Sequence, residues 1–265
     1  QLPNLPVNHM ALVAHLLAPF FHQLFRRHLL VEETLEMLRD RINKSGYSSV
    51  VGKRVVLTGG IATGKSYLLH RFAALGVPTT DADQLARAAV APDGPAWQAV
   101  RDRFGAGMFD DQGLLNRPKL GALVFADDAA LAGLNRIVHP HVRVAIDHWF
   151  ADLDQGDASQ LGIVAIPLFY ESPRTQAFHR VIVTACHDET QLARVVARGL
   201  TEDEAGQRIR AQLPTPEKVR RADYTIWTDG THAETDRQVA EILRKLRVAL
   251  ADRQETGARK QETGD

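Results

Sequence analysis

Residues 55–66 read Val-Val-Leu-Thr-Gly-Gly-Ile-Ala-Thr-Gly-Lys-Ser, and this stretch decides the fold that we expect. An apolar run typical of a buried β-strand leads into a glycine-rich turn, and residues 65–75 continue as an amphipathic segment typical of a helix. Residues 59–66 match Gly-x-x-x-x-Gly-Lys-Ser/Thr, a turn whose backbone N–H groups surround a phosphate. The glycines allow close approach, and the positive end of the helix dipole faces the anion. The order strand, loop, helix predicts an α/β nucleotide-binding fold.

Two side chains of this loop have expected roles in binding a nucleotide and its metal. Lys65 would reach the β- and γ-phosphates, and Ser66 would place a hydroxyl on Mg²⁺. The nucleotide-binding residues that we expect are Gly60, Ile61, Ala62, Thr63, Gly64, Lys65, Ser66 and Tyr67. The alternative is a glycine turn that binds no ligand. The apolar strand before the loop and the amphipathic helix after it favour nucleotide binding.

The composition limits the class of protein. A chain of 265 residues can hold one α/β domain with insertions or two small domains. The 32 basic and 32 acidic residues balance, which argues against a general nucleic-acid or membrane-surface binder. Cys186 is the only cysteine, so an intramolecular disulfide and a cysteine-based zinc site are excluded. No apolar run approaches the ~20 residues of a membrane span. We expect a cytoplasmic protein, a monomer or weak oligomer, with no nucleic-acid or membrane partner.

A pair of carboxylates follows the next predicted strand, residues 76–80. Asp81 and Asp83 stand one residue apart at the carboxyl end of that strand, where ligands bind in parallel α/β folds. One carboxylate could support the metal, while the other could accept or orient the proton of a substrate hydroxyl. The alternative is that an aspartate caps the helix that begins near Gln84. Because the pair follows the phosphate loop so closely, we favour the site.

Residues 84–159 are predicted to be mostly helical, with helices at 95–104, 117–125, 128–138 and 142–153. This is more helix than one crossover between strands requires, so we interpret it as an inserted subdomain that could supply an acceptor pocket. His139-Pro140-His141 is expected to break the helices, and without a third clustered ligand we favour a structural or substrate-contacting role over a metal site. Further strands are expected at 161–169 and 181–185, whose continuous apolar runs suit a parallel sheet covered on both faces, and a last short strand at 222–227.

The segment 187–221 is the most basic part of the chain. Arg194 and Arg198 are spaced to lie on one face of a predicted helix, and Thr201 with Glu204 forms the capping box of the next helix. Arginine forks match phosphate oxygens, so one or two of these side chains could close over ATP as part of a lid. The alternative is a solvated helical hairpin with ordinary surface charge.

Ten stretches of the chain occur in the order found in one family. They are Leu57–Ser66, Asp81–Arg87, Phe104-Gly105, Gly113–Arg117 with Val124-Phe125, Ile137–Pro140, Ile166–Glu171, Gln191–Arg198, Arg208–Gln212 and Ala222–Ile226. Over about Lys53 to Leu246 the chain resembles the dephospho-coenzyme A (dephospho-CoA) kinases, which catalyse the last step of coenzyme A synthesis. After the last strand the family usually has Asn-x-Gly, whereas this chain has Thr228-Asp229-Gly230.

The resemblance implies a P-loop kinase with three α/β/α layers, a parallel sheet, an inserted helical acceptor-binding subdomain and a helical lid. It implies that the γ-phosphoryl group of ATP is transferred to the ribose 3′-hydroxyl of dephospho-CoA. It also implies catalytic roles for Asp83 on that hydroxyl, for Asp81 beside Mg²⁺ through water, and for Lys65 and Arg198 on the phosphates. The residues implied to bind substrate are Asp83, Arg87, His139, Leu168, Glu171 and Arg194, the last also being the second choice for the lid arginine.

We therefore expect three parts. Residues 1–50 are an N-terminal helical extension of unknown role, 51–250 are the kinase domain, and 251–265 are a flexible tail after a final helix at 232–250. Within the kinase domain, the nucleotide core comprises 51–83, 160–186 and 222–250, the acceptor-binding subdomain 84–159 and the lid 187–221. The alternatives are another small-molecule or nucleoside kinase of the same fold, and a non-catalytic nucleotide-binding regulator.

Overall fold

The computed structural model describes residues 53–156, 160–172 and 178–262, so the helices predicted within 1–50 lie outside the described residues. The elements are β1 (Lys53–Gly59), α3 (Lys65–Ala74), β2 (Thr79–Asp81), α4 (Ala82–Ala89), α5 (Trp97–Phe104), the 3₁₀ helix η3 (Ala106–Met108), α6 (Arg117–Ala126), α7 (Asp128–Gly156), β3 (Leu161–Ala165), β4 (Arg180–Ala185), α8 (Asp188–Val196), α9 (Glu202–Arg210), α10 (Thr215–Arg221), β5 (Tyr224–Trp227) and α11 (His232–Glu262).

The described strands form one parallel sheet in the order β2-β3-β1-β4-β5. From the central strand β1 the chain first builds one side of the sheet, with β2 and β3, and then crosses to β4 and β5 on the other side. The loop after β1 therefore lies at the point where the strand order reverses, which is where open parallel sheets bind their ligands. The predicted α/β fold with a parallel sheet is confirmed.

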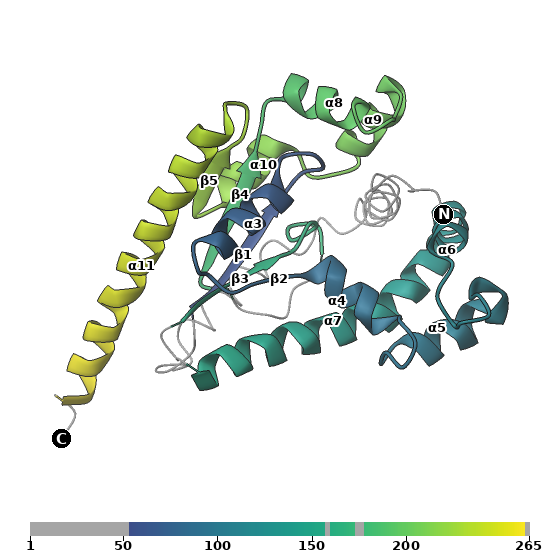
Figure 1. Cartoon of the computed structure of the whole chain (residues 1–265), viewed down its shortest axis with the longest axis horizontal. Helices are drawn as coiled ribbons and strands as arrows, with labels where there is room; N and C mark the ends of the chain where they lie inside the picture. The colour runs from purple at the N-terminus through teal and green to yellow at the C-terminus, as the bar shows by residue number, and fades with distance from the viewer. Residues whose placement is uncertain (1–52, 157–159, 173–177, 263–265) are drawn as a thin grey trace, which may run out of the picture.

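Helices cover both faces of the sheet (Figure 1). Val55 of β1 faces Phe72 of α3 and Leu246 of α11 in one core, whereas Val56 faces Phe150 of α7 in another. Successive residues of a strand point to opposite faces, so β1 contributes to both cores. The result is the predicted three-layer α/β/α arrangement.

Helices α4 to α7 form a lobe beside the sheet (Figure 1). This lobe has its own hydrophobic core, which includes Val100, Leu120, Val124 and Leu131. The 29-residue helix α7 joins the two parts, because its N-terminal half contributes to the lobe core and its C-terminal half packs on the sheet. A separate core is what an inserted helical subdomain needs.

The break predicted at His139-Pro140-His141 is wrong, because α7 continues through Pro140. Proline in a helix interior lacks the N–H for one backbone hydrogen bond and costs about 3 kcal/mol or more. Val138 before it and Ile146 after it are both buried, in different cores. Packing on each side of the proline holds the helix together across the defect.

Three element ends also differ from the prediction. β3 ends at Ala165, so Ile166–Phe169 do not extend the strand. α8 ends at Val196, which leaves Arg198 just beyond the helix. α11 continues to Glu262, so the end predicted at Leu250 is wrong; residues 251–262 consist mainly of good helix formers such as Ala, Arg, Gln and Glu. No helix within the described ranges combines the length and apolar character needed to cross a membrane.

Candidate active site

The loop between β1 and α3 requires residues with little or no side chain. Gly64, the residue before α3, has φ +99°, a conformation that side-chain-bearing residues rarely adopt. A Cβ atom on Gly59 would collide with the side chain and backbone of Thr184 on β4. Ala62 also has a positive φ, +61°. The pattern recognised in the sequence therefore encodes the shape of the loop.

No side chain caps the N-terminus of α3. The N–H groups in the first turn of a helix have no acceptor within the helix, and together with the helix dipole they attract an anion. Ser66 is exposed in this turn, so its hydroxyl is accessible from solvent. This end of α3 is suited to hold phosphate oxygens.

The other side of the loop is held by buried side chains. Gln212 accepts a hydrogen bond from the Ile61 N–H at 2.7 Å, and Gln191 donates to the Ile61 carbonyl at 2.8 Å. The Thr63 hydroxyl lies 2.5 Å from that of Thr184 and donates to the Gly60 carbonyl at 2.9 Å. The Ile61 N–H and the Thr63 hydroxyl are thus engaged within the protein, where they fix the shape of the loop.

Lys65, Asp81 and Asp83 meet at the carboxyl ends of β1 and β2. The Lys65 Nζ lies 3.5 Å from Asp81 Oδ2, and both side chains are largely buried. Asp81 Oδ1 accepts a hydrogen bond from the Asp83 N–H at 2.8 Å and thereby caps α4. The helix-cap alternative is thus correct for Asp81, which also lies beside the phosphate-loop lysine.

The environment of Asp83 favours proton uptake. The residue is exposed to solvent, yet its carboxyl loses part of its hydration, and this loss raises its pKa. The negative charge of Asp81 raises the pKa further, whereas the positive charges of Lys65 and Arg87 oppose the rise. Arg87 lies one helical turn along α4 from Asp83. A carboxylate with a raised pKa suits a general base, because such a base works best with a pKa near the operating pH.

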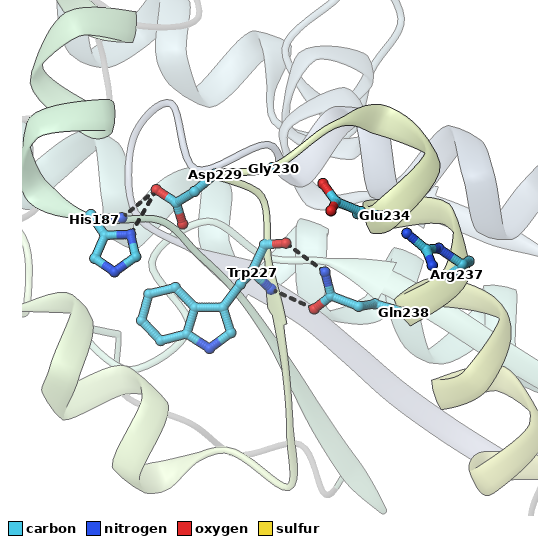
Figure 2. Close-up of a pocket in the computed structure, with 7 residues that line it drawn as sticks. All are labelled: His187, Trp227, Asp229, Gly230, Glu234, Arg237 and Gln238. Atoms are coloured by element: carbon cyan, nitrogen blue, oxygen red, sulfur yellow. Dashed lines mark hydrogen bonds and ion pairs between the residues drawn. The ribbon is translucent and has the colours of Figure 1, made fainter.

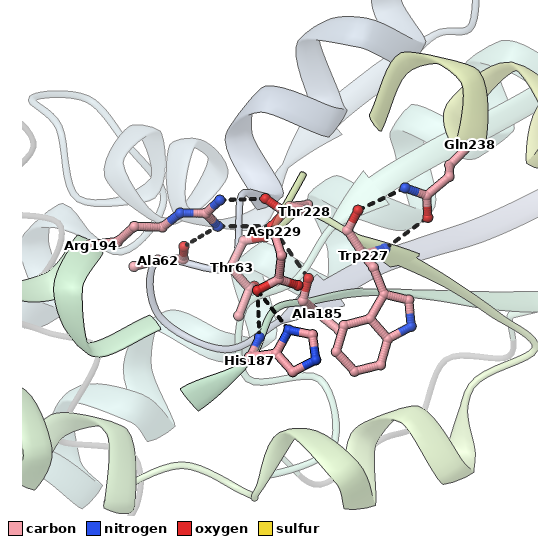
Figure 3. A network of polar contacts seen from close by, with 9 residues as sticks. All are labelled: Ala62, Thr63, Ala185, His187, Arg194, Trp227, Thr228, Asp229 and Gln238. Atoms are coloured by element: carbon pink, nitrogen blue, oxygen red, sulfur yellow. Dashed lines mark hydrogen bonds and ion pairs between the residues drawn. The ribbon is translucent and has the colours of Figure 1, made fainter. Parts of the chain in front are cut away.

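Arg194 connects the loop after β5 with the phosphate loop (Figure 3). Its guanidinium donates to the Thr228 hydroxyl at 2.8 Å, to the Thr228 carbonyl, and to the Ala62 carbonyl at 3.4 Å. The Thr228 hydroxyl in turn donates to the Thr63 carbonyl at 2.9 Å. Thr228 stands in the segment that departs from the expected Asn-x-Gly, and it carries this connection. Arg194 therefore lies against the phosphate loop.

The base of the predicted lid packs on the phosphate loop. Val195 of α8 and Ala205 of α9 share a small core with Ile61 and Ala62. The capping box of Thr201 and Glu204 begins α9 as predicted. Arg198 follows α8, and loss of hydration together with the nearby charge of Arg194 lowers the pKa of its guanidinium. Two arginines thus lie close together beside the loop.

Two residues expected in the acceptor pocket, Glu171 and Leu168, are buried in this structure. Glu171 is buried, pairs with the buried Lys218 at 2.9 Å and accepts from the Leu213 N–H at 3.0 Å. The structure gives it a role in holding α10 and its preceding loop. Leu168 is also buried, in the turn after β3. His139 is half-buried on α7, and its lost hydration and the charge of Arg143 lower the pKa of the imidazole.

The side chain of Tyr67 packs against α11. Its hydroxyl donates to Asp236 at 2.8 Å, and its ring stacks on that of His232 with the ring centres 4.6 Å apart. The hydrogen bond to Asp236 is the largest of the effects that raise the pKa of the Tyr67 hydroxyl. Tyr67 can therefore contribute its backbone at the phosphate site while its side chain anchors α3.

A family model described as dephospho-CoA kinase matches residues 53–234. The chain belongs to the dephospho-CoA kinase family. A curated dephospho-CoA kinase from Bacillus cereus is 40% identical over 193 residues, which are 72% of this chain and 96% of that protein. One from Shouchella clausii is 42% identical over 193 residues, with 72% and 98% covered.

Two solved structures are similar to this member of the dephospho-CoA kinase family. The crystal structure of TT1252 from Thermus thermophilus is 29% identical, has a TM-score of 0.61, and covers 75% of this chain and 99% of its own. A dephospho-CoA kinase from Campylobacter jejuni is 24% identical, has a TM-score of 0.54 and shares the fold. The match covers 74% of this chain and 97% of that one.

Sequence reasoning missed a pocket beside the nucleotide side of this kinase family's fold. The pocket has a volume of about 460 Å³ and is lined by His187, Trp227, Asp229, Gly230, Glu234, Arg237 and Gln238 (Figure 2). Asp229 accepts from the His187 backbone at 2.8 Å and pairs with its ring at 3.0 Å, and these contacts lower the pKa of Asp229 although burial opposes ionisation. Its residues come from the turn between β4 and α8, from the end of β5 with the loop after it, and from α11, so only the folded sheet brings them together.

The Glu171–Lys218 pair was also missed, and it allows a test of stability. Lys218→Met would leave the Glu171 carboxylate buried without its counter-charge, which we expect to cost about 3–5 kcal/mol in the free energy of unfolding. Urea unfolding followed by circular dichroism measures this loss. The double variant Glu171→Gln/Lys218→Met keeps an acceptor for the Leu213 N–H and should recover most of it. A single variant as stable as the original chain would contradict the pairing.

Proposed function

We propose that this chain catalyses the ATP-dependent phosphorylation of dephospho-CoA at the ribose 3′-hydroxyl, producing coenzyme A and ADP. Besides family membership, the arrangement of Lys65, Asp81 and Asp83 supports this proposal. Lys65, at the uncapped N-terminus of α3, lies beside Asp81, and the same pair of carboxylates includes Asp83 with its raised pKa. A phosphate-binding cation and a potential base thus stand next to each other.

The donor side of the site would hold ATP. The first-turn N–H groups of α3 and the Lys65 ammonium would bind phosphate oxygens, with Arg198 approaching from the lid. The Ser66 hydroxyl and the Asp81 carboxylate supply the oxygen donors that Mg²⁺ prefers, and Mg²⁺ is commonly bound by few protein groups together with substrate phosphates and water. When bound there, Mg²⁺ would neutralise charge on the phosphate oxygens.

The acceptor side would activate the hydroxyl. Asp83 would take the proton of the 3′-hydroxyl while that oxygen forms a bond to the γ-phosphorus and the bond from the γ-phosphorus to the ADP oxygen breaks. Lys65 and Arg198 would stabilise the charge that develops on the transferred group. Positioning and charge neutralisation account for most of the catalysis in phosphoryl transfer, so these groups are sufficient for the chemistry.

We also propose a separate role for each of two segments of the kinase domain. The separate core of α4 to α7 supports residues 84–159 as the acceptor-binding subdomain, and the packing of α8 and α9 on the phosphate loop supports 187–221 as the lid. We further propose a cytoplasmic enzyme that acts as a monomer or weak oligomer.

The proposed activity is tested by following ADP release from Mg-ATP with dephospho-CoA, nucleosides and shikimate as separate acceptors. We expect turnover with dephospho-CoA and a product heavier by one phosphoryl group in mass spectrometry. Turnover with another acceptor alone would indicate a different small-molecule kinase. Binding of ATP without turnover of any acceptor would favour the non-catalytic regulator.

A further inference from the structure

Two arginines lie together in the helical lobe, where α4 meets the beginning of α6. Arg87 stands in the last turn of α4, and Arg117 is the first residue of α6. A guanidinium N–H of Arg117 donates to the Arg87 carbonyl at 3.4 Å. Both residues are half-buried. Burial and, to a smaller extent, the neighbouring charge of Arg87 lower the pKa of the Arg117 guanidinium.

No ion pair links either arginine to a carboxylate in the part of the chain that the structure describes. Within the described ranges, no carboxylate lies within 4.0 Å of either guanidinium. Arg117 also occupies the N-terminus of α6, where the helix dipole disfavours a cation. Arg117 could simply cap the C-terminus of α4, which would explain its contact with the Arg87 carbonyl. Such a cap would not require a second arginine beside it. It would also use only one of the five N–H donors of the Arg117 guanidinium. Two neighbouring arginines are suited to bind an anion, because guanidinium forks pair with phosphate and carboxylate oxygens.

The position of the pair indicates which anion fits. Arg87 lies four residues after Asp83 on α4, so the two side chains share one face of the helix about 5–6 Å apart at Cβ. The charge of Arg87 acts on Asp83, and Arg117 lies beyond Arg87. Dephospho-CoA carries its diphosphate on the 5′ carbon of the ribose whose 3′-hydroxyl reacts. An acceptor with this hydroxyl at Asp83 would place its diphosphate about one helical turn away, where the two forks stand.

We propose that Arg87 and Arg117 bind the 5′-diphosphate of the acceptor and that Arg117 is a substrate-binding residue which selects acceptors bearing that group. The inference rests on the proposed function, since it assigns a part of the same acceptor. Arginine forks bind phosphate oxygens through paired, charge-assisted hydrogen bonds, which lysine cannot reproduce.

The test compares acceptors with and without the diphosphate. Binding of dephospho-CoA and of adenosine to the full chain is measured by calorimetry, with the donor site filled by a non-hydrolysable ATP analogue. We expect Arg117→Met to lower the affinity for dephospho-CoA about 10- to 100-fold, because a hydrogen bond to a charged group contributes substantially to binding. The affinity for adenosine should remain almost unchanged. The KM for dephospho-CoA should rise by a similar factor while the KM for ATP stays the same.

Further variants separate recognition from structural damage. Arg117→Lys keeps the charge but loses the fork, so its affinity for dephospho-CoA should be intermediate, and Arg87→Met should give a selective loss like that of Arg117→Met. Arg136→Met, at an exposed position of α7 in the same lobe, is the matched control and should behave like the original chain.

The assignment of the diphosphate site would be overturned if Arg117→Met lost affinity equally for dephospho-CoA and adenosine, or lost affinity for neither. An original chain that binds dephospho-CoA no better than adenosine would also overturn it. Binding that responds to Arg117 as expected, without turnover of dephospho-CoA, would support the site and contradict the proposed function instead. The two failures are therefore distinguishable.

Discussion

Asp83→Asn is expected to lower kcat for dephospho-CoA by about 10²- to 10⁴-fold, the range by which a general base accelerates a reaction. The amide has nearly the shape of the carboxylate but cannot take up the proton of the attacking hydroxyl. Because Asn and Asp are similar in size, the KM values for both substrates should change little. Steady-state kinetics with saturating Mg-ATP measures the effect.

The pH profile provides a second measurement for Asp83. The carboxyl must be deprotonated to act as a base, so activity should fall as pH decreases through its pKa. Partial loss of hydration raises that pKa, and this acidic limb should therefore lie above the usual range for an aspartate. Asp93→Asn, at an exposed position with φ +65°, is a suitable control because Asn adopts that conformation readily. Unchanged kcat with the acidic limb intact in Asp83→Asn would exclude Asp83 as the base.

Lys65→Met is expected to lower kcat by about 10²- to 10³-fold, which is the typical effect of removing one charge-stabilising group from an active site. The ammonium at the start of α3 would contact the transferred phosphoryl group more strongly as charge develops on it. Affinity for ATP should also decrease. Binding of a fluorescent ATP analogue and single-turnover kinetics separate the two effects.

The control for Lys65→Met is Lys245→Met, which removes an exposed lysine of α11 that pairs with Glu241 at 3.4 Å. It should retain full activity. Removal of the Lys65 charge also leaves Asp81 without its partner at 3.5 Å, so thermal unfolding of both variants should be compared. A Lys65→Met variant with lower stability but normal kcat would mean that this lysine serves only to position Asp81.

Local sequence predicted most of the fold because its signals act over a few residues. The glycines at 59, 60 and 64, the apolar strand before them and the capping box at Thr201 each specify a backbone shape within one turn or strand. Errors arose where distant packing overrides local preference. Pro140 should end a helix, but α7 is held on both sides of it by two different cores.

The candidate site followed the same division. The carboxylates at 81 and 83 were identifiable because they follow a strand that a phosphate loop precedes. The different contacts of the two carboxylates could not be predicted. Asp81 caps α4 and lies beside Lys65, and the contact with Lys65 depends on how β1 and β2 lie in the sheet. Glu171 belongs to a motif of the family, yet its partner Lys218 is far along the chain and only the fold shows that the pair is buried.

The sequence by itself determined that a phosphate-binding loop begins a parallel α/β fold, because Gly59–Ser66 encodes a glycine-rich turn into α3, and the first N–H groups of that helix have no acceptor within it. Tertiary structure alone decided how that loop is held and what faces it. Gln191 and Gln212 hold one side of the loop, Arg194 and Thr228 hold the other, and Arg87 stands with Arg117 across a helix junction. The physical reason is that hydrogen bonds and charges act over a few ångströms in space, and residues so distant along the chain meet only after the sheet and its helices have packed.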